Sequence, residues 1–124
     1  MGMKSRRKGA NGEREFINLL KDYLGEITIA RNLEQVRDGG ADVVGLAEFS
    51  IEIKRAAKPL LNAWWMQAEA QAEHKIPVLA YRLDRHPWRV RIPLKAICGI
   101  GGNGLTWTIE ISVEAFCAIV RENL

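Results

Sequence analysis

The sequence is poor in the side chains from which most metal, redox and nucleophilic sites are built. Its 124 residues include two cysteines and two histidines. Cys98 and Cys117 match no metal-ligand or redox spacing, so both are expected to be small buried thiols. His74 and His86 are unpaired by spacing, which makes a histidine-based catalytic site hard to build. Any chemical site in this chain therefore has to come from other residues.

Long apolar runs are also missing. No run approaches the ~18 residues of a membrane span, and the N-terminal residues lack the apolar core of a secretory signal, so a cytoplasmic protein is expected. Hydrophobic residues nevertheless make up 48% of the chain, as in globular proteins rather than disordered ones. We expect a flexible basic arm over residues 1–9, followed by a single domain over residues 10–124.

The net charge of +3 is small but unevenly distributed. A basic cluster occupies the N-terminal arm and leaves the rest of the chain nearly neutral; its members are Lys4, Arg6, Arg7 and Lys8. A second basic stretch, residues 82–95, is interleaved with Tyr81 and Trp88. Positive charge beside aromatic faces suits a nucleic-acid backbone with partly exposed bases, although a solvated basic surface would look the same.

The order of periodic segments predicts an α/β protein. The expected elements are a helix from about Asn11 to Leu24 ended by Gly25, strands over 26–33 and the hairpin 42–54, a helix from Pro59 to about Lys75, strands over 78–83, 88–94 and 105–111, a glycine-rich loop over 99–104, and a helix from Val113 capped by Ser112. Strands in this order, joined partly by a helix, predict an α/β sandwich around a mixed sheet.

The hairpin carries two acids and a lysine that its geometry could bring together. Period-two alternation puts Glu52 and Lys54 on one strand face, away from the apolar side chains between them. With a three-residue loop, Val44 would face Ser50 and Asp42 would face Glu52. Directly opposed carboxylates destabilise a hairpin unless a cation lies near, either the lysine or a divalent ion. A register shift of one residue would separate them.

Both long helices carry polar groups on the faces predicted to be buried. Glu13 falls within the apolar stripe of the first helix, where it would either complement the helix dipole or serve a site, whereas Glu15 points nearly the opposite way. Gln67 shares a face with Trp64 in the second helix and could contact the hairpin face or be satisfied structurally. Trp64 is expected in the core, and Trp65 as an exposed DNA contact or part of a subunit interface.

Together these motifs resemble those of the PD-(D/E)XK nucleases. Asp42, followed ten residues later by Glu52-Ile53-Lys54, resembles their signature, with Ala41 where the family has proline. The opening "RRKGANGEREF" looks like the start of archaeal-type Holliday junction resolvases, and "WWMQAEAQA" with "IPVLAYRLDRHPW" is similar to a segment of resolvase-like proteins of bacteriophages. The resemblance implies a restriction-endonuclease-like αβββαβ core, with a central mixed sheet flanked by helices.

The resemblance also implies a site that binds Mg²⁺, with Mn²⁺ able to replace it. Its implied metal ligands are Asp42, Glu52, the Ile53 carbonyl and, directly or through a water, Glu13. Lys54 would orient or activate the attacking water, and Gln67 would position that lysine, the water or the DNA backbone. The residues implied to bind DNA phosphates are Lys4, Arg6, Arg7, Lys8, Arg55, Lys58 and Arg82.

The implied activity is that of a metal-dependent DNA endonuclease, most simply a Holliday junction resolvase acting in DNA recombination and repair. Such an enzyme nicks two strands symmetrically, so a homodimer is expected, and the resemblance suggests a bacteriophage origin. The alternatives are a nuclease acting on other branched or linear DNA, an inactive nucleic-acid-binding module with the same fold, and a purely structural α/β protein. Intact Asp42, Glu52 and Lys54 disfavour the inactive module.

Overall fold

The computed structural model describes residues 3–25, 30–31, 43–44, 46, 48–99 and 107–122. In chain order, its elements are α1 (Met3–Leu24), β1 (Ala30–Arg31), β2 (Val43–Val44), β3 (Phe49–Ala56), α3 (Leu61–Ala72), β4 (Ile76–Leu83), β5 (Arg89–Pro93), α4 (Lys95–Cys98), β6 (Thr108–Ile111) and α5 (Val113–Glu122). None of the helices in these ranges is long and apolar enough to cross a membrane.

Four strands form the main sheet, in the order β3-β4-β5-β6. β3 and β4 are parallel, with Glu52 opposite Leu79 and Lys54 opposite Tyr81. The other two pairs of neighbouring strands are antiparallel. Parallel neighbours need a long crossover, and α3 supplies it between β3 and β4. The predicted mixed sheet is confirmed.

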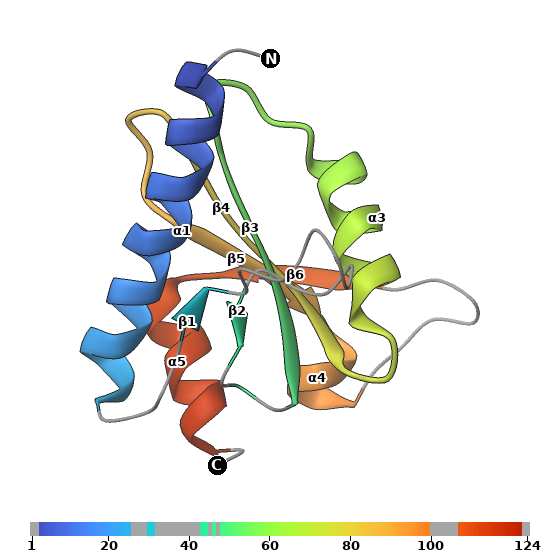
Figure 1. Cartoon of the computed structure of the whole chain (residues 1–124). Helices are drawn as coiled ribbons and strands as arrows, with labels where there is room; N and C mark the ends of the chain where they lie inside the picture. The colour runs from blue at the N-terminus through green and yellow to red at the C-terminus, as the bar shows by residue number, and fades with distance from the viewer. Residues whose placement is uncertain are drawn as a thin grey trace.

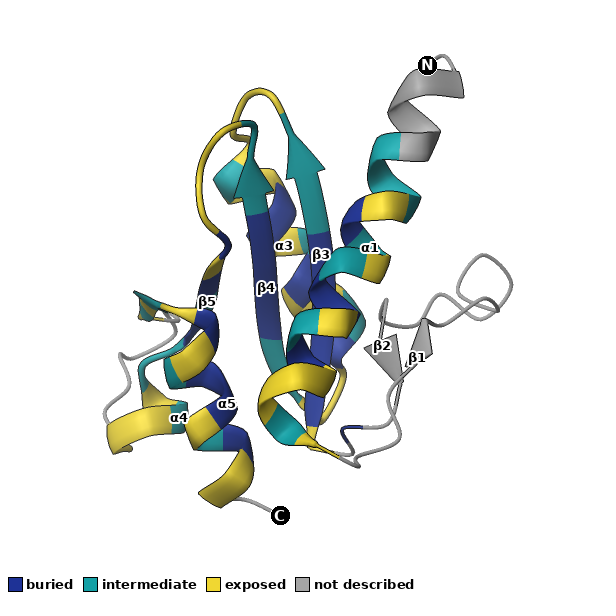
Figure 2. Ribbon diagram, turned by 90° about the vertical axis from the view of Figure 1, so that its left-hand side faces the viewer, coloured by how far each residue is buried: buried dark blue, intermediate teal, exposed yellow. Residues whose placement is uncertain are grey.

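Helices cover both faces of this sheet, with α1 and α5 on one side and α3 on the other (Figure 1). The larger core lies on the α1/α5 side and includes Phe16, Ile51 and Phe116. A smaller cluster lies under α3; its buried members are Trp64, Trp65, Ala68, Leu79 and Tyr81. Figure 2 shows the resulting band of buried residues along β3 and β4. Burial on both faces explains why the first five residues of β3 are all buried.

The first helix begins at Met3, about eight residues before the predicted start, so the predicted arm is helical from residue 3 onward. Methionine, lysine and arginine are good helix formers and extend the helix toward the N-terminus. Asn11 is consequently not a cap but an interior residue, whose side-chain oxygen accepts a hydrogen bond from Arg14. The predicted end is confirmed, because Gly25 follows α1 with a φ of 74°.

The prediction of which α3 side chains face solvent is wrong for Trp65. Trp65 is only 8% exposed, like Trp64, whereas Ala63 and Ala70 are exposed. Both indoles pack in the same buried cluster as Leu79 and Tyr81 of β4. The prediction that Trp65 is an exposed DNA contact or part of an interface is therefore wrong.

The described part of the C-terminal third follows the prediction closely, with one added element, whereas the predicted loop over 99–104 lies outside the described residues except for Gly99. β6 and α5 lie where they were expected, and the Ser112 hydroxyl oxygen accepts a hydrogen bond from the Ala115 amide as the cap of α5. The four-residue helix α4 was not predicted, because it is too short to show a period. Cys117 is buried but Cys98 is exposed, which corrects the expectation of two buried thiols.

The predicted pairing within the hairpin is not seen in the part of the chain that the structure describes. Val44 pairs with Ala30 of β1 and β3 pairs with β4, and among the described residues no pairing of β2 with β3 is found, so the predicted contact of Val44 with Ser50 stays a prediction. The predicted register rested on an assumed loop length, whereas β2 forms its ladder with the strand before it. Asp42 lies outside the described residues, and its position opposite Glu52 stays a prediction.

Candidate active site

A buried carboxylate lies at the centre of the candidate site. Glu52 is 3% exposed, on the α3 side of β3. Its Oε1 accepts a hydrogen bond of 3.0 Å from Nε2 of Gln67 on α3, and lies 3.3 Å from Nζ of Lys54 on the same strand. Burying an ionised carboxylate costs several kcal/mol unless it is paired and hydrogen-bonded. The Gln67 amide and the Lys54 charge supply part of that compensation, both at Oε1.

Local structure explains why these three side chains meet. Glu52 and Lys54 are two positions apart on a strand, so they project from the same face. Gln67 lies on the helix that crosses over this face between β3 and β4. The structure therefore brings together three of the predicted site residues, while their roles in chemistry stay predictions.

The other predicted metal ligands are only partly placed. Ile53 follows Glu52 in β3, and its side chain packs in the larger core. Glu13 is half-buried on α1, directly after Gly12, which is packed so tightly that an added Cβ would lie 2.9 Å from Cβ of Arg55 on β3. No group of three or more His, Cys, Asp or Glu side chains able to hold a metal is found among the described residues, which do not include Asp42.

Several of the basic residues predicted to bind DNA are engaged within the protein. Lys8 forms an ion pair with Asp84 at 2.9 Å, and its hydrogen bond holds the pKa of Asp84 below the ordinary value. Arg82 pairs with Glu15, which also accepts a hydrogen bond of 2.8 Å from the Trp88 indole. These contacts connect α1 to the end of β4 and the loop that follows it.

The remaining predicted DNA contacts differ in exposure. Lys58 is exposed just after β3, whereas Arg55 is half-buried against α1. Lys4, Arg6 and Arg7 lie in the first turns of α1, and their side chains are outside the described residues. Among these residues, Lys58 is thus a cation shown to be open to solvent near the end of the Glu52 strand.

A second polar network crosses the same sheet face. The Tyr81 hydroxyl donates a hydrogen bond of 2.6 Å to Oε1 of Glu110, and Arg91 donates one of 3.0 Å to the same oxygen. Burial, with the Glu110 hydrogen bond, raises the pKa of Tyr81 to about 12. Burial raises the pKa of Glu110, but the hydrogen bonds from Tyr81 and Arg91 and the nearby arginine charges lower it overall. Sequence reasoning missed this network because it depends on pairing between β5 and β6.

The mixed sheet with helices on both faces is the restriction-endonuclease-like fold that the sequence predicts. The structure is similar to that of Hjc, a Holliday junction resolvase from the archaeal hyperthermophile Archaeoglobus fulgidus. The TM-score is 0.53 at 17% identity, and the match covers 90% of this chain and 98% of Hjc. No curated protein matches the sequence. Residues 4–101 match the family described as "Phage putative PDDEXK endonuclease", and the chain belongs to this family.

Proposed function

We propose that this protein is a metal-dependent DNA endonuclease that hydrolyses phosphodiester bonds, with the four-way DNA junction as its main substrate. The observation that carries the proposal is the buried Glu52 carboxylate held by Lys54 and Gln67. Membership of an endonuclease family supports the nuclease activity, and the fold shared with Hjc supports branched DNA as the substrate.

The proposed ligands, Glu52 among them, offer oxygen donors that suit a hard divalent cation. Carboxylate and carbonyl oxygens favour Mg²⁺ or Mn²⁺ over softer metals. The residues that would hold the ion are Asp42, Glu52, the Ile53 carbonyl and Glu13. When bound, such an ion supplies Lewis-acid polarisation of the phosphate and a more acidic water.

The protein groups have separate tasks in this proposal. Lys54 carries a positive charge on the strand face beside Glu52, where it can hold a phosphate oxygen or orient the attacking water. Gln67 is a positioning residue, because its hydrogen bond fixes the orientation of the Glu52 carboxylate from a second element. A carboxylate held from both a strand and a helix is already oriented before the substrate arrives.

The proposed reaction also predicts the oligomeric state of the active enzyme. Resolution of a four-way junction requires symmetric nicks in two strands, so the active form is proposed to be a two-fold homodimer. A phage-encoded enzyme of this kind would act on DNA in the cytoplasm of the host cell. Sedimentation of the protein with and without junction DNA measures the assembly, and a monomer bound to the junction would contradict it.

The test is a cleavage assay with four labelled substrates: a four-way junction, a duplex, a flap and a single strand, each with Mg²⁺, Mn²⁺ or EDTA. Symmetric, metal-dependent cuts in the junction are expected. Equally efficient cutting of duplex would indicate a general nuclease. A folded wild-type protein that binds the DNA and cuts none of it would indicate the inactive binding module.

The site itself is tested by Glu52→Gln, with Glu48→Gln as the matched control. Glu48 is an exposed carboxylate immediately before the same strand. Loss of cleavage with retained junction binding is expected only for the Glu52 variant. Wild-type cutting rates in that variant would exclude the proposed site.

A further inference from the structure

The loop between β4 and β5, residues 84–88, is anchored to α1 at both of its ends. Asp84 at its start pairs with Lys8, and Trp88 at its end donates a hydrogen bond to Glu15. The Trp88 ring also packs against Phe16, with a centroid separation of 5.0 Å. Contacts with α1 therefore fix the position of this loop, in addition to its connections to β4 and β5.

Hydrogen bonds within the loop fix its exposed middle. The His86 amide donates to the Leu83 carbonyl at 3.0 Å, and the His86 carbonyl accepts from Nε of Arg82 at 2.9 Å. The His86 ring nitrogen Nδ1 lies 3.0 Å from the carbonyl oxygen of Asp84. An exposed loop with its backbone and ring this well restrained is suited to present a preformed binding surface.

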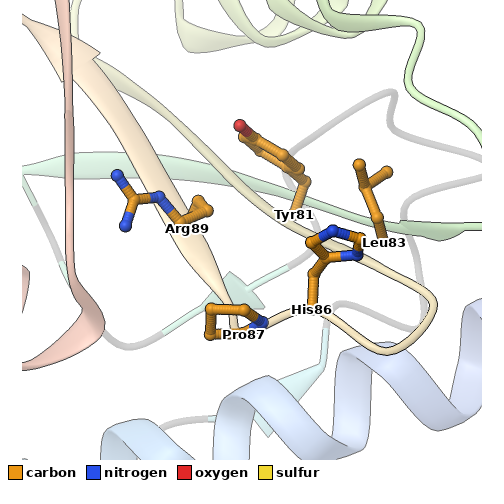
Figure 3. Close-up of a pocket in the computed structure, with 5 residues that line it drawn as sticks. All are labelled: Tyr81, Leu83, His86, Pro87 and Arg89. Atoms are coloured by element: carbon orange, nitrogen blue, oxygen red, sulfur yellow. The ribbon is translucent and has the colours of Figure 1, made fainter.

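A pocket of about 320 Å³ opens against this loop. It is lined by Tyr81, Leu83, His86, Pro87 and Arg89. Figure 3 shows Tyr81 and Leu83 projecting from β4 and Arg89 from β5, around His86 and Pro87 of the loop. The volume lies at the lower end of the roughly 300–1,000 Å³ typical of small-ligand sites.

The lining combines the exposed His86 and Pro87 rings and a buried tyrosine ring with one exposed positive charge. Tyr81 is held by Glu110 and by packing against Trp64, at a ring-centroid distance of 6.0 Å. Arg89 has 45% of its side chain exposed and lies 3.8 Å from the same glutamate, at the long end of an ion pair. None of the five lining residues is acidic. Rings that can pack against a base, beside a guanidinium that can bind a phosphate, match the two parts of a nucleotide.

The pocket lies on the same sheet face as the candidate active site. Lys54 is opposite Tyr81, and Tyr81 is opposite Arg89, so the three form a row across β3, β4 and β5. Neighbouring strands are about 4.8 Å apart, which puts the two ends of the row about 10 Å apart at the backbone. That distance corresponds to about three nucleotides of a DNA strand at a rise of 3.4 Å each.

We propose that this pocket holds one unpaired nucleotide of the DNA, with its base against the exposed His86 and Pro87 rings and its phosphate at Arg89. Tyr81, which is 6% exposed, lines the pocket and supports these residues from β4. The proposal rests on the proposed nuclease function for the nature of the ligand. Taking a base out of a helix costs least where it is already unpaired, as in flaps, forks and distorted branch points. The pocket would then favour branched DNA over continuous duplex.

The test measures binding in EDTA, where cleavage does not interfere, to a labelled fork with unpaired nucleotides and to a matched continuous duplex. The variants are Arg89→Gln and His86→Ala. The control is Arg85→Gln, which removes the same charge from an exposed position of the same loop that does not line the pocket. Circular dichroism spectra confirm that each variant is folded.

His86→Ala is expected to lose roughly five- to 100-fold in affinity for the fork, the range typical of one stacked base, with a much smaller loss for duplex. Arg89→Gln removes the phosphate contact and is also expected to bind the fork more weakly, with a smaller loss for duplex. The control should lose little, and equally, for both DNAs. Abasic sites in place of the unpaired nucleotides should weaken wild-type binding similarly, and should weaken His86→Ala by less, because that variant has already lost a ring against the base.

Two kinds of result would overturn the proposal, and they separate it from the nuclease function. Equal losses for fork and duplex, an Arg85 effect matching the Arg89 effect, or abasic DNA that binds as well as normal DNA would exclude the pocket while wild-type cleavage still stands. A wild-type protein that neither binds nor cuts DNA would refute both proposals.

Discussion

The contact between Lys54 and Glu52 gives the most direct quantitative prediction. Two charges 3.3 Å apart attract by about 5 kcal/mol at an effective dielectric constant of about 20. Desolvation of a carboxylate that is only 3% exposed offsets much of this attraction. Lys54→Met leaves the buried charge with Gln67 as a neutral donor, and we expect unfolding free energy to fall by about 2–3 kcal/mol. The figure is below that for a fully buried pair, because the lysine is 26% exposed.

A double-mutant cycle isolates this effect from the general cost of substitution. Glu52→Gln keeps the shape of the side chain and a partner for Gln67, so the double variant with Lys54→Met should be less destabilised than Lys54→Met alone. A coupling energy of about 1–3 kcal/mol is expected from urea unfolding with an unchanged m-value. Each kcal/mol corresponds to roughly 4 °C in Tm for a domain of this size. Additive single effects, or a Lys54→Met variant as stable as wild type, would refute the ion pair.

Three further predictions follow from other contacts. Asp84→Asn should free Lys8, raise DNA affinity and steepen the log–log salt dependence by about 0.9, and an unchanged slope in a salt titration would contradict this. Since that hydrogen bond lowers the pKa of Asp84, wild type keeps the pair at neutral pH and loses it only as pH falls through the lowered value. Gly12→Ala should lower the free energy of unfolding by about 1–3 kcal/mol, because the added Cβ meets the Arg55 side chain. Gly9→Ala, whose Cβ meets nothing within 4 Å, should be neutral or slightly stabilising in thermal unfolding. Equal Tm values for the two variants would disprove the close helix–strand contact. With its pKa raised to about 12, Tyr81 should give a late phenolate transition in an absorbance titration, and Tyr81→Phe should lack this transition. The contribution of Tyr81 to stability should be lost as the pH rises from 10 through 12. Ionisation near pH 10 would count against its hydrogen bond to a carboxylate.

The parts of the site that the sequence predicted are those that depend on local geometry. Alternation along a strand was enough to place Glu52 beside Lys54. The helical period and the position of α3 between two strands were enough to direct Gln67 toward the same face. The strand prediction holds because residues two positions apart on a strand share a face, whichever surfaces lie above and below it.

The predictions that failed or were missing concern tertiary contacts between elements that are distant in the sequence. Glu15 was placed nearly opposite the apolar stripe of α1, but Arg82 at the end of β4 and Trp88 of the following loop both contact it. Trp65 was expected to be exposed because the sequence of α3 does not indicate how wide an apolar surface of the sheet the helix covers. The pairing of β2 with β1 was not predicted, because a strand of two residues has no pattern from which its partner can be inferred.

The crossover from β3 through α3 to β4 has a consequence for folding. Glu52, Lys54 and Gln67 all lie within residues 49–83, one continuous segment that forms a single βαβ unit. Closing a short connection costs little chain entropy compared with pairing distant strands. We therefore expect the three groups to reach their relative positions when this unit forms, before β6 and α5 join the sheet. Truncation or mutation at the C-terminus should then lower stability while leaving the local arrangement of the carboxylate, ammonium and amide in native-like order.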